Sequence, residues 1–179
     1  MNRAVFLDRD GTLIEEKEYL HKPEQIVLFP GAVEALQRLG DAGFRLFLVT
    51  NQSGVGRGYF TMEDVAKVHA YLTDELARAG VKFEKIYVAP EHPDAPSRGR
   101  KPSPQFLFDA RDEFGIDLAQ SYMIGDKQID LECGWNAGVK TSILVRTGYG
   151  SEVADSGLAG QAAICDSFAE AADLILKNQ

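Results

Sequence analysis

The stretch Ala4-Val5-Phe6-Leu7-Asp8-Arg9-Asp10-Gly11-Thr12 joins a short apolar run to two acids, a glycine and a threonine. Four consecutive apolar residues bounded by turn-forming residues are typical of a buried strand. Taken alone, an Asp-x-Asp-Gly sequence after such a strand is most often a plain turn. Its significance therefore depends on the segments that follow the other strands of the chain.

Further short apolar runs predict strands, and longer stretches with apolar residues at three- and four-residue steps predict helices between them. The predicted strands are Ala4–Leu7, Arg45–Val49, Lys85–Ala89, Ser121–Ile124, Ser142–Val145 and Ala162–Ile164. The predicted helices are Ala32–Ala42, Met62–Ala79, Pro104–Phe114, Gln128–Ala137 and Phe168–Leu176. This alternation implies parallel strands joined by crossover helices, so the sequence predicts a three-layer α/β sandwich with its ligand site at the carboxyl ends of the strands.

Local signals at the ends of several predicted helices agree with this pattern. Thr61 and Asp64 have the spacing of a capping pair at the start of one helix, and Pro30-Gly31 precedes another. Three helices are predicted to end at glycines, namely Gly43, Gly80 and Gly115.

Composition limits the classes of protein to which the chain can belong. Its 179 residues, 45% of them hydrophobic, suit one domain over residues 1–179, with no segment long enough for a separate cap domain. A net charge of -8 opposes general binding to nucleic acid or to an anionic membrane. The apolar run near the N-terminus is too short for a signal peptide or a membrane span, so we expect a cytoplasmic protein. The sequence is consistent with a monomer and leaves the oligomeric state open.

The two cysteines, Cys133 and Cys165, lie far apart in the sequence and have no metal-ligand spacing. This argues against a disulfide framework and against a cysteine zinc site. We expect both thiols to be buried and unreactive.

Polar segments follow the predicted strands in a suggestive order. The first strand runs into Asp8, the second ends in Thr50-Asn51-Gln52, the loop after the third ends in Arg100-Lys101-Pro102, and the fourth ends in Gly125-Asp126-Lys127. In a parallel sheet these segments meet at one edge. Clustered carboxylates repel one another, and a divalent cation removes that cost. Oxygen ligands from Asp8 and Asp126 suit Mg²⁺ better than zinc or copper.

Each of these segments has an ordinary explanation when it is taken alone. Thr-Asn-Gln commonly caps a turn, Arg-Lys-Pro is most often a solvated basic patch, and Asp126 with Asp130 could simply begin a helix. The order of all four segments along one strand–helix series is what favours a shared site.

With these residues in place, the chain resembles the haloacid dehalogenase (HAD) superfamily over essentially its whole length. Asp8-Arg9-Asp10-Gly11-Thr12 is similar to the first motif, Thr50 to the second, Lys101 to the third, and Gly125-Asp126 with Asp130 to the fourth. Within the superfamily it looks most like the small heptose-bisphosphate and histidinol phosphatases, because of the Asp-Arg-Asp-Gly-Thr motif, the run from Thr50 to Phe60, and Arg-Lys-Pro. The resemblance implies a Rossmann-like core. It also implies that Asp8, the carbonyl of Asp10 and the side chain of Asp126 bind Mg²⁺, while Lys101 and Thr50 hold the transferring phosphoryl group.

The chemistry of the first motif also points to hydrolysis. Asp8, which is ionised at neutral pH, can attack phosphorus and form an aspartyl phosphate. Asp10 can protonate the leaving alkoxide and then deprotonate water. Superfamily members that preserve their phosphoenzyme, such as ion-pumping ATPases, resemble this motif but carry threonine at that position. The sequence therefore predicts that Asp8, Asp10, Thr50 and Lys101 are the catalytic residues of a phosphatase.

Substrate recognition is predicted less directly. The resemblance implies that Arg100 helps to recognise substrate, and its guanidinium can bind a hydroxyl pair or a second phosphate. Further candidates are Asn51, Gln52, Ser53, Arg57 and the segment around Glu16 to Tyr19; for Arg57 and Tyr19, simple surface packing is an equal alternative. A bisphosphorylated sugar would explain a cationic rim in an acidic protein. We therefore favour D-glycero-D-manno-heptose 1,7-bisphosphate, losing its 7-phosphate, with histidinol phosphate as the close alternative.

One feature departs from the subfamily, whose members commonly carry a cysteine and histidine zinc cluster before Arg-Lys-Pro. Here the stretch is Ala89-Pro90-Glu91-His92-Pro93, followed by Asp94-Ala95-Pro96-Ser97-Arg98-Gly99, without a cysteine. We therefore expect no zinc. A non-catalytic phosphate-binding module on the same fold, and phosphoryl transfer to an acceptor other than water, remain as alternatives. Retention of all five motif residues argues against the former.

Overall fold

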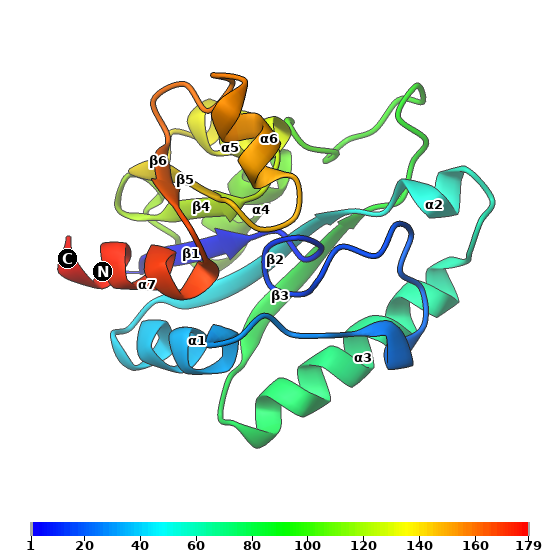
Figure 1. Ribbon diagram of the computed structural model, residues 1–179, viewed down its shortest axis with the longest axis horizontal. Helices are drawn as coiled ribbons and strands as arrows, with labels where there is room; N and C mark the ends of the chain where they lie inside the picture. The colour runs from blue at the N-terminus through cyan, green and yellow to red at the C-terminus, as the bar shows by residue number, and fades with distance from the viewer. Residues whose placement is uncertain (1, 179) are drawn as a thin grey trace.

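The computed structural model describes residues 2–178 as a six-stranded sheet between two layers of helices (Figure 1). All the strand pairings are parallel, and the strand order is β3-β2-β1-β4-β5-β6. The strands are β1 (Ala4–Leu7), β2 (Arg45–Asn51), β3 (Phe83–Ala89), β4 (Tyr122–Gly125), β5 (Thr141–Val145) and β6 (Ala163–Cys165). The predicted α/β fold with a parallel sheet is confirmed.

The helices divide between the two faces of the sheet (Figure 1). One face is covered by α1 (Ala32–Asp41), α3 (Met62–Arg78) and α7 (Phe168–Lys177), and the other by α4 (Gln105–Phe114) and α5 (Gln128–Ala137). Shorter elements are α2 (Ser53–Gly56), α6 (Gly150–Asp155) and the 3₁₀ turns η1 (Pro23–Gln25) and η2 (Leu118–Gln120).

Strand β1 is buried on both faces, which explains its unbroken apolar sequence. Val5 and Leu7 belong to the core cluster that includes residues of α1, α3 and α7. Ala4 and Phe6 belong to the cluster that includes residues of α4 and α5. Successive side chains of a strand point to opposite faces, so four residues contribute to two core layers.

Most predicted helix ends are confirmed by backbone geometry. Asp64 N donates to Thr61 Oγ1 at 3.2 Å and Thr61 N donates to Asp64 Oδ2 at 2.8 Å, which forms a capping box. The three helix-ending glycines, Gly43, Gly80 and Gly115, have φ of 84°, 76° and 66°, a conformation that favours glycine. Both thiols are free and buried, as expected.

The strand order places a change of direction between β1 and β4, where ligands bind in open α/β sheets. The carboxyl ends of β1 and β4 carry Asp8 and Asp126, and the neighbouring end of β2 carries Thr50 and Asn51. The four segments identified from the sequence thus follow one edge of the sheet.

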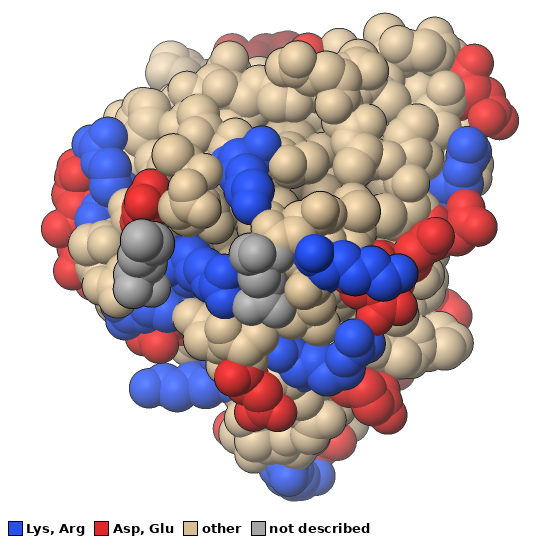
Figure 2. Space-filling model, turned by 90° about the vertical axis from the view of Figure 1, so that its left-hand side faces the viewer, with Lys and Arg blue, Asp and Glu red and all other residues tan. Residues whose placement is uncertain are grey.

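The opposite edge lies near the chain termini. Figure 2 shows this side of the molecule, where basic and acidic side chains lie beside one another among uncharged surface. No helix among residues 2–178 is both long enough and apolar enough to cross a lipid bilayer.

Candidate active site

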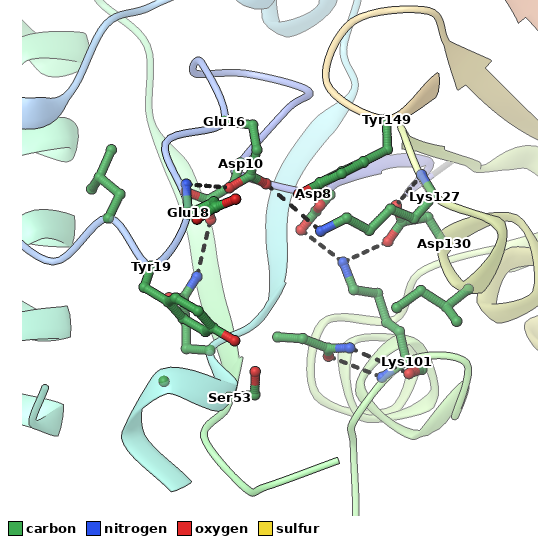
Figure 3. Close-up of a pocket in the computed structure, with 15 residues that line it drawn as sticks. Asp8, Asp10, Glu16, Glu18, Tyr19, Ser53, Lys101, Lys127, Asp130 and Tyr149 are labelled. Carbon is green, nitrogen blue, oxygen red and sulfur yellow. Dashed lines mark hydrogen bonds and ion pairs between the residues drawn. The ribbon is translucent and has the colours of Figure 1, made fainter. Parts of the chain in front are cut away.

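A cavity of about 360 Å³ opens at the carboxyl edge of the sheet (Figure 3). Its walls come from the β1 end, the loop that follows it, α2, and the start of α5. Most lining side chains are acids, amides or cations. They are Asp8, Asp10, Glu16, Glu18, Tyr19, Leu20, Asn51, Gln52, Ser53, Gly54, Lys101, Lys127, Ile129, Asp130 and Tyr149.

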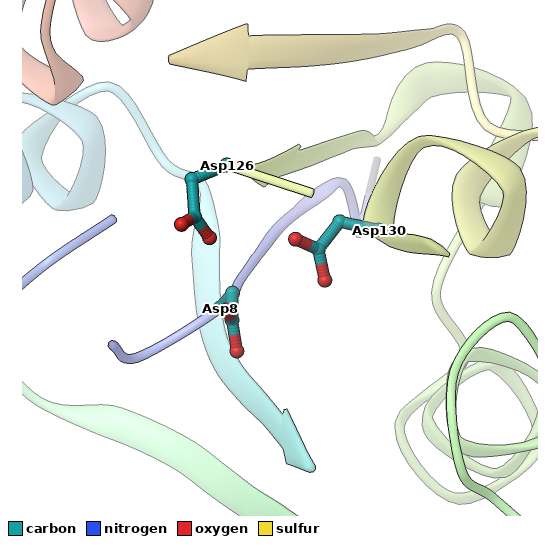
Figure 4. A group of neighbouring side chains, drawn as sticks. All are labelled: Asp8, Asp126 and Asp130. Carbon is teal, nitrogen blue, oxygen red and sulfur yellow. The ribbon is translucent and has the colours of Figure 1, made fainter. Parts of the chain in front are cut away.

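Three buried acids, Asp8, Asp126 and Asp130, lie together at the site (Figure 4). One ligand atom from each lies within 4.8 Å of the others. Asp8 and Asp126 come from strand ends, and Asp130 from the first turn of α5, where its Oδ2 accepts from Lys127 N at 3.0 Å. Such a group of hard oxygen atoms is a suitable site for a divalent cation.

The surroundings of Asp126 support this assignment. Its Oδ2 accepts from Tyr149 N at 2.9 Å, but its buried Oδ1 has no hydrogen-bond partner within residues 2–178. A Cβ atom added at Gly11 or Gly148 would lie 2.2 Å from Oδ2, so both positions need glycine for the backbone to approach so closely. A buried carboxylate oxygen without a partner is costly, and a cation would satisfy it.

Lys101 provides the only buried ammonium group that contacts these acids among the described residues. Its Nζ donates to Asp8 Oδ1 at 2.8 Å and to Val49 O at 2.7 Å, and lies 2.7 Å from Asp130 Oδ1 (Figure 3). Burial alone would lower the pKa of Lys101, but Asp130 and Asp8 outweigh it and raise this pKa. Lys101 is therefore a fixed positive charge.

Two ammonium groups, Lys101 and Lys127, act on these three carboxylates and do not fully neutralise them. The pKa of Asp126 is raised by burial and then by the charges of Asp8 and Asp130. The pKa of Asp130 is raised chiefly by burial, in spite of its contact with Lys101. The site thus has more negative charge than its own residues balance, which again favours a bound cation.

Asn51 makes two hydrogen bonds to the backbone of Lys101. Its Oδ1 accepts from Lys101 N at 3.0 Å and its Nδ2 donates to Lys101 O at 3.3 Å, so the amide holds the lysine backbone. The residue still lines the cavity.

Asp10 and Thr50 are linked by Gln52. Gln52 Nε2 donates to Thr50 Oγ1 at 2.8 Å and to Asp10 Oδ2 at 3.1 Å. Thr50 is buried at the end of β2, and Asp10 keeps 15% of its side chain exposed toward the cavity. Gln52 thus connects two candidate catalytic residues.

The residues predicted to bind substrate fall into two groups. Glu16, Tyr19, Gln52 and Ser53 line the cavity together with Asn51. Arg57 and Arg100 do not belong to the lining set. Burial and then the charge of Arg57 lower the pKa of Arg100.

Several lining residues were not predicted as site residues, notably Asp130, Lys127 and Tyr149. Asp130 belongs to the fourth motif, and its spacing from Asp126 is the signal that identifies it as a site residue. Lys127 lies 3.7 Å from Glu16 and 4.9 Å from the ring centre of Tyr149. Tyr149 follows β5, and nothing in its local sequence indicates a role.

The loop before Lys101 is held by its own polar contacts. Ser97 Oγ donates to Glu91 Oε2 at 2.8 Å and accepts from Arg100 N at 3.1 Å. Arg98 forms a two-pronged ion pair with Asp109 of α4. His92 Nδ1 accepts from Asp94 N at 3.2 Å.

Comparisons with known proteins agree with this geometry. The family model described as "HAD-hyrolase-like" matches residues 99–171. A D-glycero-D-manno-heptose-1,7-bisphosphate 7-phosphatase of Chlorobaculum tepidum is 43% identical over 84% of this chain and 81% of its own length. The D-glycero-beta-D-manno-heptose-1,7-bisphosphate 7-phosphatase of Escherichia coli K12 is 40% identical over 81% of this chain and 80% of its own.

A solved structure has the same fold. The D,D-heptose 1,7-bisphosphate phosphatase of B. bronchiseptica, crystallised with magnesium and phosphate, is 31% identical and superposes with a TM-score of 0.91 over 99% of both chains. The chain therefore belongs to the HAD-like hydrolases, in the family of phosphatases that includes these heptose-bisphosphate enzymes.

Proposed function

We propose that this phosphatase removes the 7-phosphate of D-glycero-D-manno-heptose 1,7-bisphosphate through transient phosphorylation of Asp8. The observation that carries the proposal is the position of the Asp8 carboxylate, which lines the cavity, receives the Lys101 ammonium at 2.8 Å, and lies among two further buried acids. A nucleophile, a fixed cation and a cation-binding acid group therefore share one cavity.

The residues are assigned as follows. Asp8 attacks the phosphorus, and Lys101 and Thr50 hold the phosphoryl oxygens. Asp10 donates a proton to the leaving oxygen and then accepts one from the attacking water. Asp8, the Asp10 carbonyl and Asp126 are the proposed ligands of Mg²⁺, and Asp130 holds Lys101 in place.

The charge of the site explains why a metal is required. A carboxylate that approaches a phosphate is repelled by roughly 1 kcal/mol per charge pair at about 4 Å in water, and by about 4 kcal/mol at an effective dielectric constant of about 20. When bound, Mg²⁺ supplies positive charge that offsets this repulsion. Lys101 supplies the rest from the protein. We propose that no zinc takes part.

The substrate assignment rests on the names of the relatives and on the polar residues in and beside the cavity. The two curated relatives and the solved structure described above are all named heptose-bisphosphate phosphatases. The cavity offers acid, amide and hydroxyl groups suited to sugar hydroxyls, from Glu16, Tyr19, Asn51, Gln52 and Ser53, and we assign the adjacent Arg57 and Arg100 to the second phosphate. Histidinol phosphate carries no second phosphate to use these arginines, which makes it the second candidate.

We further propose that residues 1–179 work as one phosphatase domain in the cytoplasm, where phosphorylated sugars are retained. A non-catalytic phosphate-binding module is disfavoured because Asp8, Lys101 and the acid group keep a geometry suited to catalysis.

The deciding experiment compares kcat/KM for heptose 1,7-bisphosphate, histidinol phosphate and a panel of sugar phosphates with Mg²⁺. An Asp8→Asn preparation purified identically reports contaminating phosphatase. Heptose bisphosphate should lead the panel, and the 1-phosphate should remain in the product. A higher kcat/KM for histidinol phosphate would overturn the substrate assignment, and parent activity no greater than that of Asp8→Asn would overturn the enzyme assignment.

A further inference from the structure

Arg9 separates the two aspartates of the first motif, and its side chain is directed inward. Only 1% of it is exposed, and it is the largest fully buried side chain in residues 2–178. A buried guanidinium is tolerated only when its donors have partners, so its contacts show what it is placed to do.

Two of those contacts go to Asp10. Arg9 Nε donates to Asp10 Oδ2 at 2.9 Å, and Arg9 Nη2 donates to Asp10 Oδ1 at 3.1 Å. A two-pronged contact of this kind fixes the plane of a carboxylate as well as its distance. Gln52 adds a third donor to Oδ2, at 3.1 Å.

The far side of the guanidinium is held by groups distant in the sequence. Arg9 Nη1 lies 3.1 Å from Nε2 of His69, a buried residue on α3, and Nη2 donates to Leu20 O at 3.3 Å. A guanidinium cannot accept a hydrogen bond, so His69 Nε2 is the acceptor and the ring is neutral with its proton on Nδ1. Burial and then the charge of Arg9 lower the pKa of His69 to about 3, which agrees with a neutral ring.

We propose that Arg9, itself held by His69, is a positioning residue that fixes the Asp10 carboxyl group for proton transfer. This inference rests on the proposed function. In the first step a proton passes from Asp10 to the leaving oxygen as the bond from phosphorus to that oxygen breaks and the bond from Asp8 to phosphorus forms. In the second, Asp10 takes a proton from water as the water oxygen bonds to phosphorus and Asp8 is released.

The hydrogen bonds from His69 of α3 through Arg9 to Asp10 require a particular kind of side chain at position 69. The residue must offer an acceptor at the place of Nε2, and glutamine can do so with Oε1, whereas leucine fills similar space without an acceptor. Without that acceptor, a buried Arg9 donor loses its partner, and the guanidinium is free to turn away from Asp10.

The test compares His69→Leu and His69→Gln, with Mg²⁺, on heptose 1,7-bisphosphate and on an aryl phosphate whose leaving group hardly needs a proton. His69→Leu should lower kcat for the heptose substrate by about 10²-fold, as small displacements of catalytic groups do, with KM unchanged and a much smaller loss on the aryl phosphate. His69→Gln should restore most of the heptose activity. Arg9→Lys retains the positive charge but cannot make the two-pronged contact with Asp10, so it should behave like His69→Leu. It replaces His69→Leu in the test if that variant fails to fold.

Arg45→Met is the matched control. Arg45 is a partly buried arginine that pairs with Glu84 at 2.9 Å near the opposite edge of the sheet, so its loss can lower stability but should leave the ratio of the two activities unchanged. Equal losses on both substrates, or equal effects of leucine and glutamine at position 69, would show that Arg9 and His69 only stabilise the fold. If the parent protein is active and that result is obtained, only this inference fails; an inactive parent overturns the proposed function as well.

Discussion

Lys101 Nζ donates to Asp8 Oδ1 at 2.8 Å, although 93 residues separate the two in the sequence. Asp8 follows the central strand β1, and Lys101 reaches it from the loop between β3 and α4, held in place by Asn51 and by the Val49 carbonyl. A cation so close to the proposed nucleophile can guide a phosphate toward it.

Asp8→Asn should abolish turnover while the fold survives. An amide is a poor nucleophile and a weaker metal ligand, yet its oxygen can still accept from Lys101, and one charge leaves a crowded acid group. Phosphate release and the thermal midpoint are measured together, with Asp112→Asn, an exposed acid paired with Arg111, as the control. Activity of Asp8→Asn within about tenfold of the parent would contradict a covalent role for Asp8.

Asp10→Asn should lower kcat for sugar phosphates by about 10²–10⁴-fold, the usual contribution of a general acid–base group. The loss should be smaller for an activated aryl phosphate, because its leaving group departs without a proton. The amide oxygen can still accept from Gln52, but an amide cannot accept from both donors of the buried Arg9, so the thermal midpoint should fall. Equal losses on both substrates would mean that Asp10 does not act as the acid of the first step.

Stability of the metal-free protein should fall as pH rises above the ordinary pKa of aspartate. The pKa values of Asp126 and Asp130 are raised in the fold, so between the unfolded value of 3.8 and the raised values the folded state holds more protons than the unfolded chain. Mg²⁺ should offset this loss, and its stabilising effect should grow with pH. Thermal midpoints with a chelator and with Mg²⁺ from pH 5 to pH 8 test this; a stabilisation that does not vary with pH would argue against binding at these acids.

The sheet and the main acids could be predicted because they are encoded locally. The predicted β1 and α5 coincide with the observed Ala4–Leu7 and Gln128–Ala137, and the polar residues that follow each strand mark the site directly. The short helices α2 and α6 were missed, since four or six residues are too few to show a helical period.

Contacts between segments distant in the chain could not be predicted from the sequence. His69 occupies the buried face of an amphipathic helix, where it reads as an ordinary core residue, and its contact with Arg9 spans 60 positions. Likewise, no feature of the sequence near Asn51 predicts that its side-chain amide binds the Lys101 backbone.

Purified protein should contain zinc far below one equivalent. A structural zinc site usually needs four nitrogen or sulfur ligands, and the loop before Lys101 offers only His92, whose Nδ1 accepts from Asp94 N. Elemental mass spectrometry gives the metal content directly. A chelator should remove activity and Mg²⁺ alone should restore it, whereas stoichiometric zinc, or recovery only with zinc, would contradict this prediction.

Ser97→Ala should test what holds that loop instead. Ser97 Oγ joins Glu91 to the backbone N–H of Arg100, the residue directly before Lys101. Loss of these two partly buried hydrogen bonds should loosen the loop and lower kcat/KM for heptose bisphosphate by about tenfold. The thermal midpoint should fall little, because a single hydrogen bond contributes only about 1 kcal/mol. Ser156→Ala is the matched control, since that hydroxyl donates to Val153 O within the exposed segment that ends α6. If Ser97→Ala matched the parent in kcat/KM, the hydroxyl would not be what positions Arg100, and the Arg98 ion pair with Asp109 would be the next contact to remove.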